Sequence, residues 1–283
     1  MSHLTAPAPA PTDAAVARLQ RPRPLRGVYA GNARAVIERG FKVILTQNWI
    51  ILASGFFEPV FYLLAMGYGL GNLVGTVEGP GGAQIPYLQY IAPALLATSA
   101  MNGAIYDSTW NVFFKMHFAK LYQAMVSTSL GPLDVAIGEI FMALFRGLLY
   151  AIGFMVVLYV LGIVHGATPL LMIPAAVLVA FGFAAFGMGV TSLMKTFQQM
   201  DLINFVLLPM FLLSSTLYPI TIYPDWLQWA VKAMPLWHGI ELMRQLAAGV
   251  FTSMTPWHVA YFLVMTVLGV WFTTTRLKQL FLR

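Results

Sequence analysis

Six long apolar segments limit what this chain can fold into. They run from Trp49 to Leu70, Tyr87 to Trp110, Leu133 to Val164, Pro169 to Met194, Leu202 to Ile222 and Trp257 to Thr275. An α-helix needs roughly 20 apolar residues to cross the hydrocarbon core of a bilayer. The chain is 59% hydrophobic and only 9% charged, whereas soluble domains carry about 25% charged residues. We therefore expect an all-α membrane protein with six transmembrane helices.

Lysine and arginine are distributed unevenly around these segments. If the N-terminus is placed inside, 13 of the 16 basic residues fall in cytoplasmic segments, and only Lys232 and Arg244 fall outside. Such an excess marks the cytoplasmic side, so we expect both termini in the cytoplasm. Because the basic residues lie in short clusters beside apolar segments, they indicate contact with membrane lipids and not with nucleic acid. Residues 1–32 are rich in Ala and Pro and predict a disordered basic cytoplasmic tail, followed by one transmembrane domain over residues 33–283.

Two cytoplasmic segments outside the spans have helical patterns. Ala33 to Leu45 places apolar and charged side chains on different faces, which is typical of a helix in the membrane interface. In the loop before the third span, five apolar residues recur at helical spacing: Phe114, Phe118, Leu121, Tyr122 and Met125. They predict one short helix whose apolar stripe packs on this protein, on lipid or on a partner.

Two apolar segments lie on the outer side, between the fifth and sixth spans. Asp225 to Met234 and Leu236 to Gly249 are too short to cross a bilayer, so we expect re-entrant or interfacial helices there. Glu241 and Arg244 are three residues apart on the second segment and predict an ordinary surface ion pair.

Among the charged residues within the predicted spans, we single out Glu58, Glu139 and Arg146 as candidate site residues. A charge at the centre of a bilayer costs about 2.5–3.5 kcal/mol, so such groups normally face a protein interior or a wet cavity. Two roles are open. The three residues line or gate a pathway, or they pair with one another and hold the helices together.

Motifs for catalysis and nucleotide binding are missing from the sequence. The chain has no cysteine, no G-x-x-x-x-G-K-[ST] phosphate loop, and histidines without metal-ligand spacing. We therefore expect no metal site, no cofactor and no enzymatic activity in this chain. If it drives uphill transport with ATP, another chain must bind the nucleotide.

The order of the predicted elements resembles that of the permease subunits of type-2 ABC exporters. KLYQAMVSTSLGPLDVAIGEI, from Lys120 to Ile140, is similar to the signature that follows the coupling helix of this family. FFEPVFYLLAMGYGLG and MPLWHGIELMRQL resemble the nodulation-factor and daunorubicin-resistance branch. One departure is Phe114-Lys115-Met116-His117, where many members carry a basic–acidic pair.

The resemblance implies a function. Two permease copies, as a homodimer or a heterodimer, would join two cytoplasmic ATPases in a bacterial inner membrane. The partner subunits would carry ATP and Mg²⁺, and an amphipathic drug, lipid or lipid-linked glycan would be exported. The coupling helix that docks on the ATPase would contain Lys115, Phe118, Lys120, Leu121, Tyr122 and Met125.

Two other functions are compatible with the residues. A stand-alone ion-coupled transporter or channel would use Glu58 and Glu139 as proton or cation sites. A membrane-embedded enzyme or scaffold is the third possibility, and it lacks a convergent set of catalytic side chains. Transport by the purified chain without ATP would separate the ion-coupled transporter from the ABC permease.

Overall fold

The computed structural model describes residues 31–46 and 49–281. The predicted tail over residues 1–32 lies outside these ranges except for its last two positions. The described chain is mostly helical, which confirms a largely α-helical protein. The sequence patterns do not predict one small feature, an antiparallel hairpin of β1 (Thr76–Glu78) and β2 (Gln84–Pro86).

The first half of the chain contains two long, nearly continuous helices. The first consists of α3 (Trp49–Leu64), the π-helical stretch η1 (Ala65–Leu70) and α4 (Gly71–Val74). The second begins after the hairpin with α5 (Tyr87–Tyr106) and continues through two π-helical stretches, η3 (Asp107–Asn111) and η4 (Phe114–Phe118). The short helix α6 (Leu121–Val126) follows.

Three helices of the described residues are long and apolar enough to cross a membrane. They are α7 (Pro132–Val160), η5 (Thr168–Leu171) with α8 (Met172–Thr191), and most of α12 (Thr255–Phe281). They correspond to the third, fourth and sixth predicted spans, so the protein is a multi-pass membrane protein. The total of six spans stays a prediction.

The fifth predicted span, Leu202 to Ile222, is wrong in its extent. Helix α9 (Asp201–Leu213), preceded by η6 (Phe197–Met200), ends at Leu213, and Ser215 has a φ of 61°. The two helices together form a shorter apolar segment of about 25 Å. The chain then passes through η7 (Ile220–Ile222) into α10 (Asp225–Ala233) and α11 (Pro235–Ala248), which lie where the two outer helices are predicted.

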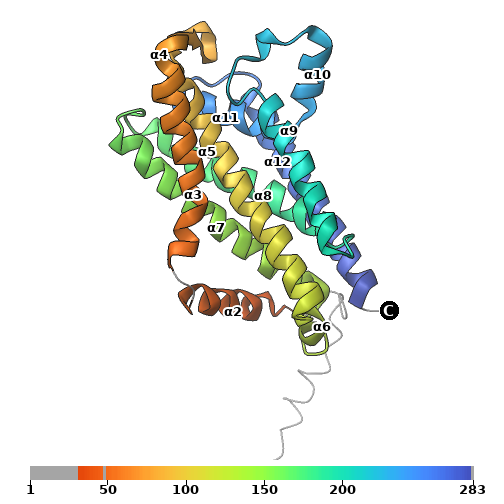
Figure 1. Ribbon diagram of the computed structural model, residues 1–283. Coiled ribbons are helices and arrows are strands. Elements are labelled where there is room, and N and C mark those ends of the chain that lie inside the picture. The colour runs from red at the N-terminus through yellow and green to blue at the C-terminus, as the bar shows by residue number, and fades with distance from the viewer. Residues whose placement is uncertain (1–30, 47–48, 282–283) are drawn as a thin grey trace, which may run out of the picture.

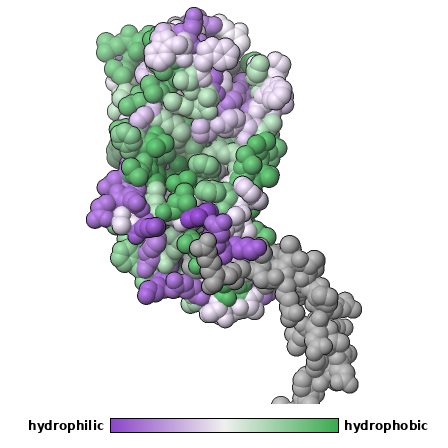
Figure 2. Space-filling model, turned by 90° about the vertical axis from the view of Figure 1, so that its right-hand side faces the viewer, coloured by the Kyte–Doolittle hydropathy of each residue, from purple (hydrophilic) through white to green (hydrophobic). Residues whose placement is uncertain are grey.

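The molecule has two distinct ends (Figure 1). The hairpin, α4 and α10 lie at one end, which we call the hairpin end, and α2 (Ala33–Thr46) and α6 lie at the other, which we call the α6 end. Figure 2 shows a surface that is largely hydrophobic over the middle of the molecule, with hydrophilic residues gathered toward the α6 end. This distribution is the one expected where lipid covers the middle of a bundle.

Helix α2 lies across the α6 end of the bundle (Figure 1) and packs its apolar face on α7. Val36 is buried, and a Cβ atom at Gly138 would lie 2.5 Å from it, so only glycine permits this approach. The Phe41 ring meets the Phe145 ring edge-on at 4.8 Å. These contacts fit the amphipathic pattern of α2, whereas its position relative to lipid stays a prediction.

The core lies where α5, α7, α8 and α12 pack together, with α8 contacting the other three. Small residues allow this packing. A Cβ atom at Gly269 of α12 would lie 2.8 Å from the Ala185 backbone of α8, so the two helix backbones are in direct contact there.

Candidate functional site

A cavity of about 610 Å³ lies between α3, α5, α7 and α9. Its apolar and aromatic lining is interrupted by a small set of charged and amide side chains: Glu58, Asn102, Arg146 and Asn204. Concave apolar sites with a few convergent polar groups are the usual form of ligand sites. The structure thus brings Glu58 and Arg146, two of the three predicted site residues, to one cavity. Glu139, the third, is not among the lining residues.

Glu139 and Arg146 of α7 pair with the long α5 helix and not with each other. Lys115 Nζ lies 2.5 Å from Glu139 Oε2, and Arg146 Nη2 lies 3.4 Å from Asp107 Oδ1. Asp107 and Lys115 are eight residues apart on the long α5 helix, and Glu139 and Arg146 are seven residues apart on α7. Similar spacings are required when two antiparallel helices lie side by side. The predicted mutual pairing of Glu139 and Arg146 is therefore wrong, although the idea that such charges join helices agrees with the structure.

Both ion pairs lie in protein surroundings of low polarity. The side chains of Glu139, Arg146 and Asp107 are nearly fully buried, and only Lys115 is partly exposed. Removing one partner of such a pair leaves a buried charge and costs about 3–5 kcal/mol. The pairs therefore connect the long α5 helix to α7, and loss of one partner is expected to weaken this connection.

Arg146 also has a donor that no described residue uses. Its Nε atom is buried and makes no hydrogen bond to a described residue. A buried donor without an acceptor costs about 1–3 kcal/mol. Another part of the Arg146 side chain borders the cavity.

Glu58 has no ion-pair or hydrogen-bond partner among the described residues. It lies on α3 directly before Pro59, and both residues line the cavity. A carboxylate within an apolar helix is costly in lipid. Its position on a cavity lowers this cost. Of the two charged residues that line the cavity, Arg146 is paired with Asp107, so Glu58 is the one that a bound molecule would meet without an ion-pair partner among the described residues.

The loop before α7 is not the single helix that its apolar stripe predicts. The helical path of α5 ends at Phe118, and Lys120 takes a left-handed conformation with a φ of 48° before α6 begins. This break turns the two halves of the stripe in different directions. Phe118 is 64% exposed and Lys120 is exposed, whereas Tyr122 is 0% exposed and Met125 is buried.

A surface role is therefore wrong for Tyr122 and Met125 in this conformation. Both belong to the hydrophobic core, while Leu121 is only partly buried and packs against that core. Burial raises the pKa of Tyr122 well above its usual value. Tyr122 thus fixes α6 to the bundle and does not face a partner.

An aromatic cluster surrounds the exposed part of the loop. The Phe114 and Phe118 rings stack at 5.1 Å, and Phe197 at the start of η6 meets Phe114 at 6.1 Å. A ring nitrogen of His117 lies 3.0 Å from the Met194 carbonyl oxygen. The end of the long α5 helix is therefore joined to the α8–α9 connection, which carries the cavity wall α9.

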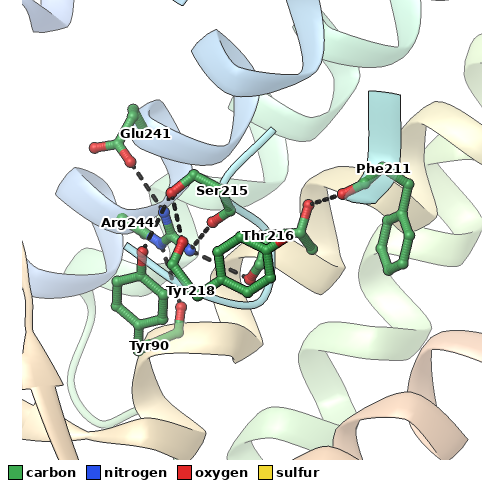
Figure 3. Close-up of polar contacts among 7 residues, drawn as sticks. All are labelled: Tyr90, Phe211, Ser215, Thr216, Tyr218, Glu241 and Arg244. Carbon is green, nitrogen blue, oxygen red and sulfur yellow. Dashed lines mark hydrogen bonds and ion pairs between the residues drawn. The ribbon is translucent and has the colours of Figure 1, made fainter. Parts of the chain in front are cut away.

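At the hairpin end, Arg244 of α11 is the centre of a buried polar cluster (Figure 3). Its guanidinium group stacks on the Tyr90 ring, with Cζ 3.7 Å from the ring centre, and donates to Glu241 Oε1 at 2.9 Å. It also donates to the backbone carbonyls of Ser215 and Thr216, at 2.6 Å and 3.3 Å. The predicted surface ion pair does form, but Arg244 is buried and joins α5, α11 and the turn after α9.

The Arg244 cluster explains why α9 stops at Leu213. The last carbonyls of a helix have no partner within it. Here the Thr216 hydroxyl donates to the Phe211 carbonyl at 2.7 Å (Figure 3). The Tyr218 hydroxyl donates to the Leu212 carbonyl at 3.1 Å. Arg244 then binds the carbonyls of the following turn. These bonds hold residues 214–218 in a turn.

The structure also brings together two histidines that sequence spacing separates. The Nδ1 atoms of His238 on α11 and His258 on α12 lie 2.8 Å apart, and the Tyr261 ring stacks on His238 at 4.1 Å. One imidazole donates and the other accepts, so at least the accepting ring is neutral. Burial and the neighbouring His258 lower the pKa of His238 to about 4. No group of three or more metal-ligating side chains occurs in the described part of the chain.

Comparisons with known proteins identify the family. Residues 32–248 match the model of the ABC-2 type transporter family. Nodulation protein J of Rhizobium leguminosarum bv. trifolii is 30% identical over 227 residues, which cover 80% of this chain and 85% of the relative. Nodulation protein J of Sinorhizobium fredii is 32% identical over 188 residues, covering 66% of this chain and 70% of the relative. The chain therefore belongs to the ABC-2 type transporter family and is a type-2 ABC permease of the branch that contains the nodulation proteins J.

Proposed function

We propose that this chain is the transmembrane subunit of an ATP-driven exporter that moves an amphipathic drug, lipid or lipid-linked glycan out of the cytoplasm. The cavity between α3, α5, α7 and α9 carries this proposal. It combines apolar and aromatic walls with Glu58 and Arg146, so it suits a molecule with both a polar and an apolar part. Glu58 and Arg146 are the proposed contacts in the translocation pathway.

The exposure of α9, which forms one wall of the cavity, supports the proposal of a second permease copy. Among the residues of α9 only Met210 is buried, and Phe205 is exposed like most of its apolar neighbours. A helix that forms one wall of a cavity and packs so little on its own chain is completed by another chain or by lipid. A homodimer that encloses two such cavities is the assembly we propose.

The α6 end is the proposed docking site for a separate ABC ATPase. Phe118, Lys120 and Phe114 are exposed there, and the ion pair of Lys115 with Glu139 joins this end to α7. Force applied to the docking site would reach α7 through the ion pair and α9 through Phe197 and the aromatic cluster. ATP and Mg²⁺ would be bound by the ATPase, and this chain would hydrolyse nothing.

The proposed topology has six spans with both termini in the cytoplasm of a bacterial cell. The helices α3 with η1 and α5 complete the set with α7, α8, α9 and α12, and the α6 end faces the cytoplasm. The basic residues of α2, the loop and the C-terminal end of α12 support this orientation.

Co-purification with the candidate ABC ATPase of the source organism tests the proposal. The variant Phe118→Asp places a charge in the exposed aromatic cluster and is expected to lower ATPase recovery at least tenfold. Phe251→Asp is the matched control, since Phe251 is 61% exposed and directly follows Val250, whose side chain lies beside Gly81 between the hairpin strands, and it should leave recovery unchanged. Equal recovery with both variants would contradict the docking site.

A transport assay distinguishes the exporter from an ion-coupled transporter. Proteoliposomes with both subunits should transport a fluorescent amphiphile only with ATP and Mg²⁺. Transport by this chain alone, driven by a pH gradient, would overturn the proposal. Among the described residues, Glu58 is the carboxylate that lines the cavity, while Glu139 is paired with Lys115 and Asp107 with Arg146.

A further inference from the structure

The two helices between α9 and α12 differ in their environment. Most of α11 is buried, including Leu236, Ile240 and Met243, so α11 belongs to the bundle. On α10 only Val231 is buried, while Trp226 and Trp229 are 72% and 75% exposed. Two adjacent exposed indole rings form an apolar patch, and such patches mark surfaces that contact lipid or a partner.

The indole rings lie one helical turn apart on the outer face of α10. Residues three apart in a helix share a face, and Lys232 follows three residues later with its Nζ atom 5.7 Å from the centre of the Trp229 ring. The exposed face thus combines two amphipathic rings with an ammonium group. This combination is the one that settles between the acyl chains and the phosphates of a bilayer.

The position of α10 along the bundle agrees with this chemistry. The Tyr261 hydroxyl donates to the carbonyl of Ala233, the last residue of α10, at 3.2 Å. Tyr261 lies one turn after Trp257, which is 69% exposed near the start of α12. From Trp257 to the basic pair Arg276 and Lys278, α12 rises about 30 Å, which is the thickness of the hydrocarbon core.

We propose that Trp226 and Trp229 anchor α10 in the headgroup region of the leaflet at the hairpin end, where Trp257 extends the same aromatic belt. The partner of this surface is lipid and not a second copy or a soluble protein. Only α10 lies in the interface, and α11 packs within the bundle. The inference requires a membrane protein but neither the ATPase nor the direction of transport.

Quenching by brominated lipids tests the anchor in the full-length protein reconstituted in phosphatidylcholine bilayers. Lipids brominated near the headgroup should quench the wild-type tryptophan fluorescence more strongly than they quench Trp226→Phe/Trp229→Phe, which keeps aromatic rings on α10. Trp237→Phe is the control, since Trp237 is packed against His238 and His258 and should contribute little to this quenching.

Two outcomes would overturn the inference. If the double variant loses quenching by aqueous acrylamide but not by brominated lipid, the rings face water or a soluble partner. If neither kind of quenching changes, the rings are covered by protein, as in an interface between two copies. In both cases the co-purification test of the proposed function is unaffected, so the two failures can be told apart.

Discussion

The guanidinium group of Arg244 lies over the Tyr90 ring, with 3.7 Å between Cζ and the ring centre. Its two sets of donors bind the carbonyls of the turn after α9 on one side and Glu241 on the other. A residue on α11 thereby holds the turn after an apolar helix that ends 31 residues earlier in the chain. The planar fork and the stacking are properties of arginine that lysine lacks.

Substituting Arg244 should therefore destabilise the protein strongly. Arg244→Met leaves two buried carbonyls without a donor and is expected to cost about 3–5 kcal/mol. Arg244→Lys keeps the charge but not the fork and should cost less. Glu241→Gln, at a partly exposed position, should cost about 1 kcal/mol or less. Thermal unfolding in detergent measures the three, and equal transition temperatures for Arg244→Met and the wild type would contradict the cluster.

The ion pair between Lys115 and Glu139 predicts charge-reversal rescue. Lys115→Glu and Glu139→Lys each create a repulsive buried contact and should each lower stability by about 3 kcal/mol or more. The double variant restores opposite charges across the same helices and should recover at least half of this loss. A double-mutant cycle on thermal unfolding gives the coupling energy, and additive effects would exclude the contact.

Glu58 should be a residue of function and not of stability. It has no partner in the described part of the chain, so Glu58→Gln should change the free energy of unfolding by less than about 0.5 kcal/mol. Because Glu58 lines the cavity, the same variant should change ATP-dependent transport of charged amphiphiles. A loss of stability without a change in transport would assign Glu58 a structural role.

The histidine pair predicts a loss of stability in acid. The pKa of His238 is about 4 in the folded protein and about 6.5 when exposed. The unfolded chain thus binds more protons between these values, and stability falls as the pH drops from about 6.5 to 4. The effect amounts to about 1–2 kcal/mol after allowance for partial exposure.

His238→Gln, which keeps a polar side chain without titrating, should flatten this pH dependence. Transition temperatures of the variant and the wild type, compared from pH 7 to pH 4, check the prediction. The difference between the two proteins removes the contribution of carboxylates that titrate in the same range. A slope that is unchanged in His238→Gln would contradict the role of the pair.

The sequence predicts the parts of the fold that depend on local patterns. The apolar segments that became α7, α8 and α12, the amphipathic α2, and the two helices after α9 follow from composition and helical period. The end of α9 does not, because the donors that hold its last turns come from Thr216, Tyr218 and the distant Arg244. The break at Lys120 is also missed, since a stripe at helical spacing does not reveal a left-handed residue within it.

The candidate site was predictable only in part. Glu58 and Arg146 are conspicuous as charges within apolar segments, and both reach the cavity. Their partners depend on the register of α5 against α7, which no local pattern specifies. Asp107 gives one signal, an acidic residue near the end of an apolar segment, whereas His238 and His258 give none because they belong to different helices.

The side of the membrane that the α6 end faces tests the account most directly, because docking to an ATP-hydrolysing subunit requires the cytoplasm. The chain has no cysteine, so Lys120→Cys and Ala83→Cys each introduce a single thiol at an exposed position, one at the α6 end and one in the hairpin. With a membrane-impermeant maleimide on intact spheroplasts, Ala83→Cys should be labelled, and Lys120→Cys should be labelled only after the membrane is opened. Labelling of Lys120→Cys in intact spheroplasts, with Ala83→Cys protected, would contradict the docking of an ATPase at this end.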